Sequence, residues 1–271
     1  MFESKLGPAE VAVLETFVVP QYLSLFGDAA LNMLLTGDVA AIAHLGCRTG
    51  YPDRELMDRV SNCSIVGVDA SAAAIQLARN KAAAFQKGQV RYTVATDMPT
   101  RLPAGGFSHA LSLHPIGGRE MRGELFSEME RLLYAGGQAL VALPLRGSFQ
   151  ELADLLREYA LKHDEGEFGK TLDLAVATRP TIETLSEELE SAGFDDIDVA
   201  VMPTQLGFES GRAFTEDPTT RLLILPEIVA NLGIGGLGAS LDYARDAIDK
   251  YWSESDFQLT INIGCASARK H

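Results

Sequence analysis

The amino-acid sequence predicts a single α/β domain built on a parallel β-sheet with helices on both faces. Between residues 39 and 145, apolar runs of strand length alternate with stretches at helical spacing. Alternation of this kind requires parallel strands joined by crossover helices. Two more strand-like runs follow late in the chain, on either side of a mostly helical stretch. No internal repeat or Pro/Ser-rich linker divides the 271 residues, so one domain is the simplest account.

The elements are expected in a regular order. A helical cap covers about residues 9–36 and is broken by Pro20 and Gly27. Strands are expected over 39–43, 63–69, 90–97, 108–116, 138–145, 196–202 and 257–268. Helices are expected over 53–60, 72–85, 119–133, 149–162 and 181–192, and a helical lid insertion fills about 204–255. Ser71 is placed to cap the second of these helices.

The chain is strongly acidic, with a formal net charge of −14. Because phosphates would be repelled, nucleic acid is not expected as a main partner. Ten Asp or Glu residues and one basic residue, Arg212, lie between Thr181 and Thr220. This run is consistent with a solvated acidic face or with a docking surface for a basic protein partner, and the sequence alone leaves both open.

The sequence also bears on compartment. The N-terminus has no basic segment leading into an apolar core, so no signal peptide is expected, and no apolar run reaches the length of a membrane span. Cys47, Cys63 and Cys265 are far apart and odd in number, so they form neither a metal-type spacing nor a disulfide framework. We therefore expect a cytoplasmic protein with no resident metal.

The loop between the first strand and its helix reads HLGCRTG, residues 44–50. A loop at this place approaches a cofactor through its backbone, which favours glycine, and Gly46 and Gly50 meet this need. The second strand ends in Asp69, where a carboxylate can accept hydrogen bonds from both ribose hydroxyls of a nucleoside. The third strand also ends in an acid, Asp97. Three strand ends thus converge on the carboxyl edge of the sheet, where ligands of such folds bind.

These segments resemble the class I S-adenosylmethionine-dependent methyltransferases. HLGCRTG is similar to the first motif of that family and VGVDAS to the second, and ATDMPTRLPAGGFSHALSL, ERLLYAGGQALVALP and FQLTINIGCASARK resemble its later strands. The resemblance covers about Tyr22 to Lys270 and is nearest to the quinone-biosynthesis and malonyl-carrier-protein methyltransferases. It implies a Rossmann-like seven-stranded sheet, mostly parallel with an antiparallel last strand, and a helical lid before that strand.

The resemblance also implies roles for individual residues toward S-adenosylmethionine. Asp69 is expected on the cofactor ribose, Asp97 beside the adenine amino group, and the backbone of Met98 beside the ring. The full set of expected cofactor contacts comprises Gly46, Cys47, Arg48, Gly50, Asp69, Ala70, Asp97 and Met98.

Three positions on the cofactor face depart from the family pattern. His44 stands where the family has an acid, Arg48 where it has the middle glycine, and Ser108 where an acid follows Phe107. A non-glycine residue in a left-handed conformation at position 48 costs about 1–2 kcal/mol. The guanidinium of Arg48 would attract the carboxylate of the cofactor and repel its sulfonium. The loop is therefore interpreted either as a cofactor loop of reduced affinity or as one that no longer binds.

Two residues are candidates for the acceptor side. Methyl transfer from a sulfonium needs an aligned nucleophile and exclusion of water, and a base only when the acceptor is protonated and weakly acidic. His114, at the end of the fourth strand, is the candidate base, or else a histidine that packs beside the site. Tyr22 is expected either to cover the site or to pack through its aromatic edge. His109, inside the same strand as His114, is expected to be structural.

One glycine motif is expected to be misleading. GIGGLG, residues 233–238, matches a dinucleotide-binding pattern, but the segment before it contains Pro226 and reads as helix. Such a loop should instead follow a strand and open a helix within a β-α-β unit. We interpret it as a turn between two lid helices.

Two functions are consistent with the sequence. The first is S-adenosylmethionine-dependent methyl transfer to a small-molecule or carrier-bound acceptor held under the lid. The second is a catalytically inactive methyltransferase-like domain that serves as a protein-interaction or scaffold module. A nicotinamide-dependent oxidoreductase is disfavoured, because the HLGCRTG loop lacks a third glycine at the required spacing.

Overall fold

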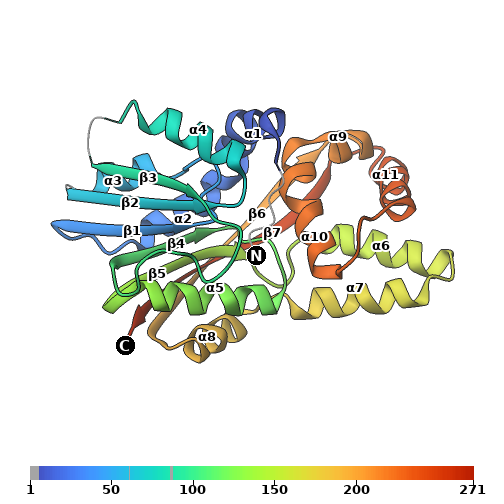
Figure 1. The fold of residues 1–271 in the computed structure, drawn as a ribbon. Helices are drawn as coiled ribbons and strands as arrows, with labels where there is room; N and C mark the ends of the chain where they lie inside the picture. The colour runs from blue at the N-terminus through green and yellow to red at the C-terminus, as the bar shows by residue number, and fades with distance from the viewer. Residues whose placement is uncertain (1–5, 61, 86–87) are drawn as a thin grey trace.

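The protein is built around one twisted sheet (Figure 1). A computed structural model describes residues 6–60, 62–85 and 88–271, so residues 1–5, on which the expectation about a signal peptide partly rests, lie outside it. The strand order is β3-β2-β1-β4-β5-β7-β6. The strands are β1 (Val39–Leu45), β2 (Asn62–Asp69), β3 (Gln89–Val94), β4 (Phe107–Leu113), β5 (Leu133–Pro144), β6 (Phe194–Phe208) and β7 (Phe257–Lys270).

The strand directions confirm the predicted sheet. β1 to β5 pair in parallel, whereas β7 is antiparallel to both of its neighbours, β5 and β6. From β1, the chain adds β2 and β3 on one side of the sheet and then β4 and β5 on the other. The direction of strand addition therefore reverses between β1 and β4, whose carboxyl ends lie next to each other. In open α/β sheets, this point is where ligands bind.

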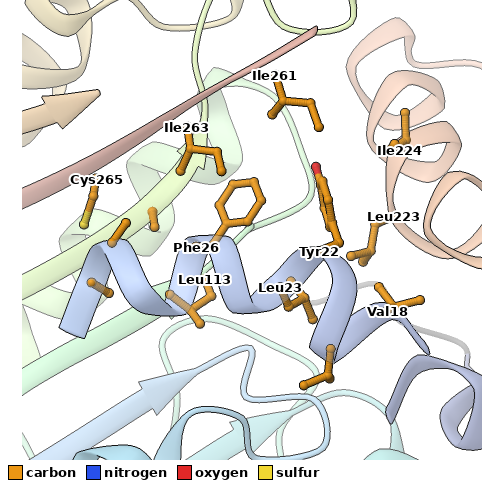
Figure 2. Packing of buried hydrophobic residues seen from close by; sticks show 14 of the residues in the cluster. Val18, Tyr22, Leu23, Phe26, Leu113, Leu223, Ile224, Ile261, Ile263 and Cys265 are labelled. Carbon is orange, nitrogen blue, oxygen red and sulfur yellow. The ribbon is translucent and has the colours of Figure 1, made fainter. Parts of the chain in front are cut away.

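Helices cover both faces of the sheet. An N-terminal helical segment consists of α1 (Pro8–Val13), η1 (Leu14–Leu23) and α2 (Ser24–Met33), of which η1 is π-helical and contains Pro20. This segment packs on the same core as β1, β5 and β7, through side chains that include Val18, Tyr22 and Phe26 (Figure 2). α5 (Arg119–Leu132) and α8 (Ile182–Ser191) contribute to the core on the opposite face. α3 (Asp53–Arg59) and α4 (Ala72–Ala82) follow β1 and β2.

The remaining helices gather beyond one end of the sheet (Figure 1). They are α6 (Gln150–Lys162), α7 (Gly166–Thr178), α9 (Gly211–Glu216), η2 (Thr220–Ile224), α10 (Leu225–Leu232) and α11 (Ala239–Tyr251). α7 is a helix that the sequence analysis does not predict, and β6 extends to Phe208, so the helical lid begins after that residue. Trp252 follows α11 and packs edge-on against Phe257 at the start of β7, with the two ring centroids 5.0 Å apart.

Local sequence signals explain where several helices start and stop. The Ser71 hydroxyl accepts a hydrogen bond from the backbone of Ala74 and caps α4, as predicted. α10 ends at Gly233, which adopts a left-handed conformation (φ 65°) that costs glycine little. GIGGLG is therefore a turn between α10 and α11, which confirms the interpretation of that motif.

The expectation about membrane spans needs a correction. By length and composition, the continuous helical run Pro8–Met33 is long and apolar enough to cross a membrane. Residues of this run are nevertheless buried against the sheet, among them Leu14, Val18, Tyr22 and Phe26. A buried core helix passes the same test, so this run is only weak evidence for a membrane span.

Candidate functional site

The loop after β1 is tied to the end of β2 by backbone hydrogen bonds. The amides of Gly46 and Cys47 both donate to the carbonyl of Val68, at 2.9 and 3.0 Å. The amide of Arg48 donates to Asp69 Oδ2 at 3.0 Å, and the amide of Ser71 donates to Asp69 Oδ1 at 2.8 Å. The Asp69 carboxylate is buried and organises both the loop and the start of α4. It is thus held at the place where the sequence predicts a ribose-binding acid.

Arg48 adopts a left-handed backbone conformation, with φ 46°. Its guanidinium reaches across to the end of β4, where NH1 donates to the carbonyl of Leu113 at 2.8 Å and NH2 to the carbonyl of His114 at 2.7 Å. Burial lowers the pKa of the Arg48 guanidinium, and the nearby Asp69 carboxylate counters that effect. Arg48 therefore links the ends of β1, β2 and β4.

The departure at His44 is explained by a buried network that the sequence analysis does not predict. His44 Nδ1 lies 2.7 Å from Asp53 Oδ1, and the Tyr92 hydroxyl donates to Asp53 Oδ2 at 2.7 Å. All three side chains are buried. Position 44 thus holds a histidine that is paired with a carboxylate nine residues later. Gly50 belongs to the same arrangement, because a Cβ there would lie 2.4 Å from the Tyr92 hydroxyl oxygen.

The departure at Ser108 is also structural. The Ser108 hydroxyl lies 2.7 Å from His109 Nδ1 and accepts from the backbone amide of Ala41 at 2.9 Å. His109 Nε2 lies 2.9 Å from the carbonyl of Leu35. Ser108 and His109 thus connect β4 by hydrogen bonds to β1 and to the segment that follows α2. This arrangement agrees with the structural role expected for His109.

The predicted cofactor residues do not all lie together in direct contact. The loop hydrogen bonds join Gly46, Cys47, Arg48 and Asp69, and the amide of Gly50 donates to the carbonyl of Cys47 at 2.7 Å. Cys47 is buried, and burial raises the pKa of its thiol well above its ordinary value, so it is not a reactive group. Of the remaining predicted residues, Ala70 and Met98 are half-buried and Asp97 is exposed.

A second polar cluster lies under the lid, beside the end of β4. The Tyr22 hydroxyl lies 3.0 Å from His114 Nε2, and both residues are fully buried. Glu227, on α10, places Oε2 3.5 Å from the same His114 nitrogen. Arg179 donates from NH2 to Glu227 Oε1 at 2.9 Å. Four buried polar side chains therefore meet in one chain of contacts. They come from η1, the residue after β4, α10 and the segment between α7 and α8.

The protonation states in this cluster follow from burial. Burial, together with the nearby cations Arg48 and Arg179, lowers the pKa of His114 to about 3, so the imidazole is neutral at neutral pH. Burial raises the pKa of Glu227, which Arg179 opposes. Burial and the Glu227 carboxylate raise the pKa of Tyr22, so its hydroxyl remains protonated. The cluster thus combines a neutral imidazole, a protonated phenol and a carboxyl group beside a guanidinium.

The sequence predicts site roles for Tyr22 and His114 but not for Glu227 and Arg179, the other two members of this cluster. Glu227 is an isolated acid in the apolar stretch ILPEIVANL. A charged residue at a position predicted to be buried is rare unless it is paired. That rule offered a signal for Glu227, whereas Arg179 precedes Pro180 in a segment with no recognisable pattern. Among the described residues, no group of three or more His, Cys, Asp or Glu side chains is placed to hold a metal ion.

Comparisons with known proteins agree with this architecture. Residues 42–137 match a family model described as a methyltransferase domain. YcgJ of Bacillus subtilis has a TM-score of 0.60 at 12% identity, with 92% of this chain and 99% of that chain covered. Phosphoethanolamine N-methyltransferase 2 of Haemonchus contortus, solved with phosphomonomethylethanolamine and S-adenosylhomocysteine, has a TM-score of 0.60 at 16% identity, with 99% of this chain and 59% of that chain covered.

A further structural neighbour has a different activity in its name. The [4+2]-cyclase SpnF has a TM-score of 0.51 at 17% identity, with 92% of this chain and 80% of that chain covered. No curated protein matches the chain. Strand order and family match together show that the protein has the class I methyltransferase fold. Within that fold, the match to the methyltransferase-domain model covers residues 42–137.

Proposed function

We propose that the protein transfers a methyl group from S-adenosylmethionine to a small or carrier-bound acceptor. The observation that carries the proposal is the position of Arg48. Its amide bonds to the predicted ribose-binding Asp69, and its guanidinium bonds to the carbonyl of His114 in the cluster under the lid. One residue therefore joins the predicted cofactor edge to a buried polar cluster on the acceptor side, and that adjacency is what an in-line methyl transfer requires.

The residues present fit most of the cofactor. The Asp69 carboxylate is held rigidly at the end of β2 and would hold the ribose, while Asp97 and the Met98 backbone would border the adenine. At the methionine end, pairing of the Arg48 guanidinium with the cofactor carboxylate would require its bonds to the carbonyls of Leu113 and His114 to break. When bound, the cofactor supplies an activated methyl group, and the neutral His114 and the Tyr22 hydroxyl would orient the acceptor. Burial of this cluster excludes water from the reacting groups.

A specific observation also favours the alternative of an inactive scaffold domain. Both oxygens of Asp69 already accept backbone hydrogen bonds, and the Ser71 hydroxyl beside it donates to the carbonyl of Leu6 at 3.0 Å. The predicted cofactor edge is thus partly satisfied by the chain itself. In this alternative, the acidic run 181–220 would bind a basic protein partner, and that interaction remains a prediction.

Calorimetric titration with S-adenosylmethionine and S-adenosylhomocysteine separates the two functions. We expect binding in the micromolar range, about −8 kcal/mol, and its loss in Asp69→Ala. Asp58→Ala is the matched control, because Asp58 is exposed on α3. No heat and no thermal stabilisation at millimolar cofactor would contradict methyl transfer and favour the scaffold.

A further inference from the structure

Glu227 presents a buried carboxylate oxygen that has no hydrogen-bond partner. Its side chain is only 5% exposed. One oxygen, Oε1, is held by Arg179, whereas Oε2 has no partner among the described residues. Buried polar atoms are paired in the great majority of native structures, so an unpaired one marks a place where a ligand atom or a water molecule binds.

The nearest group to this oxygen does not satisfy it. His114 Nε2 lies 3.5 Å away, a separation too long for a strong hydrogen bond, and it already contacts the Tyr22 hydroxyl at 3.0 Å. His114 is neutral, so no ion pair forms with Glu227. On the same imidazole, Nδ1 also lacks a partner. With Arg179 Nε, three polar atoms of the cluster are unpaired within the described part of the chain, and they belong to residues that contact Glu227 or are Glu227 itself.

The charges around the cluster favour a neutral ligand. The terminal nitrogens of Arg179 donate to Glu227 and to the carbonyl of Ser148, and its guanidinium lies over the ring of Phe149. Arg48 is committed to the carbonyls at the end of β4. The terminal nitrogens of both guanidinium groups already have partners, and Arg179 Nε has none among the residues that the structure describes. A phosphate or carboxylate could therefore pair with two terminal nitrogens here only by displacing Glu227 and Ser148 or the β4 carbonyls.

We infer that Glu227 recognises the acceptor, with Oε2 taking the hydrogen of a hydroxyl or amine group on a neutral molecule placed beside His114. The inference rests on the proposed function, because it assigns the acceptor to this cluster. It narrows that function to acceptors that carry an O–H or N–H group. Glu227 lies on α10, so a residue of the lid would contact the acceptor.

Small aromatic probes test this recognition directly. Phenol, aniline, toluene and benzoate are similar in size and differ in the group they present. We would titrate each into the full chain at neutral pH, with and without S-adenosylhomocysteine, and follow binding by ¹H–¹⁵N NMR. A hydrogen bond to a charged group predicts that phenol or aniline binds about tenfold more tightly than toluene. Benzoate is expected to bind no better than toluene. Comparison of phenol with aniline distinguishes a hydroxyl from an amine preference.

Variants at Glu227 decide whether that residue is responsible. Glu227→Gln should remove most of the preference for phenol or aniline over toluene. Replacement of the whole ion pair, Glu227→Leu with Arg179→Met, should abolish it without leaving an unpaired buried charge. Glu216→Gln, which alters an exposed ion pair with Arg212 elsewhere in the lid, should leave it unchanged. Equal binding of toluene and phenol to the unaltered chain, or a preference that survives both Glu227 variants, would overturn the inference.

The two proposals fail in different ways. If S-adenosylhomocysteine does not bind but the Glu227-dependent preference is present, methyl transfer is wrong and the recognition site stands. If S-adenosylhomocysteine binds and no probe preference exists, the recognition role is wrong and methyl transfer stands.

Discussion

Removal of the Arg48 side chain is the sharpest test of how this site is built. Arg48 makes two hydrogen bonds from a charged donor to the carbonyls of Leu113 and His114, at 2.8 and 2.7 Å. It does so from a backbone conformation with φ 46°, which is strained for a non-glycine residue. Arg48→Ala removes the bonds and keeps the strain, whereas Arg48→Gly removes both.

The expected magnitudes follow from these contacts. Each bond from a charged donor contributes about 1.5–3 kcal/mol, and part of that is recovered when water reaches the freed carbonyls, so Arg48→Ala should lower the free energy of unfolding by about 3–4 kcal/mol. Relative to Arg48→Ala, Arg48→Gly relieves the left-handed strain, which stabilises the folded state by about 1–2 kcal/mol. The greater backbone freedom of glycine in the unfolded state offsets about 0.5–1 kcal/mol of this stabilisation. The glycine variant should therefore be less stable than wild type and slightly more stable than the alanine variant.

Urea unfolding followed by far-UV circular dichroism measures both variants. The reasoning fails if Arg48→Ala unfolds within about 0.5 kcal/mol of wild type, the range typical of surface substitutions that remove no specific interaction. A glycine variant clearly less stable than the alanine variant would refute the strain argument on its own. The family pattern favours glycine at this position, so these variants also show what the arginine contributes to the fold.

Three further predictions concern Gly50, Asp53 and His114 at the same edge of the sheet, and Gly105→Ala, in the loop before β4, is the control for Gly50→Ala. Gly50→Ala should destabilise the protein by about 2–4 kcal/mol, because its Cβ would lie 2.4 Å from the Tyr92 hydroxyl oxygen and φ is 81°. Gly105→Ala, at φ 63° with no atom within 4 Å of the added Cβ, should cost only about 1–2 kcal/mol in the same urea assay. Asp53→Asn should cost about 3 kcal/mol, because it removes a buried charge that accepts hydrogen bonds from two side chains; a melting temperature equal to wild type would contradict this. His114 has its pKa lowered to about 3 when folded, so the unfolded state binds the proton first, and stability should be complete above about pH 6.5 and fall as the pH drops toward 3. In His114→Gln, the free energy of unfolding measured across that range should depend less steeply on pH, by up to about 1.4 kcal/mol per pH unit.

The sequence predicts the sheet well because the strands carry strong and local signals. β2 contains the apolar run IVGV and ends at Asp69, and β4 is buried along its whole length and is followed by His114. The N-terminal helical segment and the insertion before β7 are likewise expected from helical spacing. α7 was missed because its stretch, GEFGKTLDLAVAT, opens with two glycines and has only one buried residue, Leu172.

The candidate site was less accessible to sequence reasoning because its contacts are distant along the chain. The carboxylate that pairs with His44 comes from Asp53, on α3, and the same carboxylate accepts a hydrogen bond from Tyr92, on β3. The pairing of Arg179 with Glu227 joins segments 48 residues apart. No local pattern encodes such pairs, since each depends on how helices and strands pack.

The packing of Trp252 against Phe257 gives the protein an internal fluorophore at a useful place. It is the only tryptophan in the chain, and it lies where the last lid helix meets β7. Fluorescence excited selectively from tryptophan therefore reports on the boundary between the lid and β7 and not on the rest of the sheet. Comparison of the fluorescence signal with far-UV circular dichroism in a single denaturation experiment would show, without any label, whether the lid opens before the sheet unfolds.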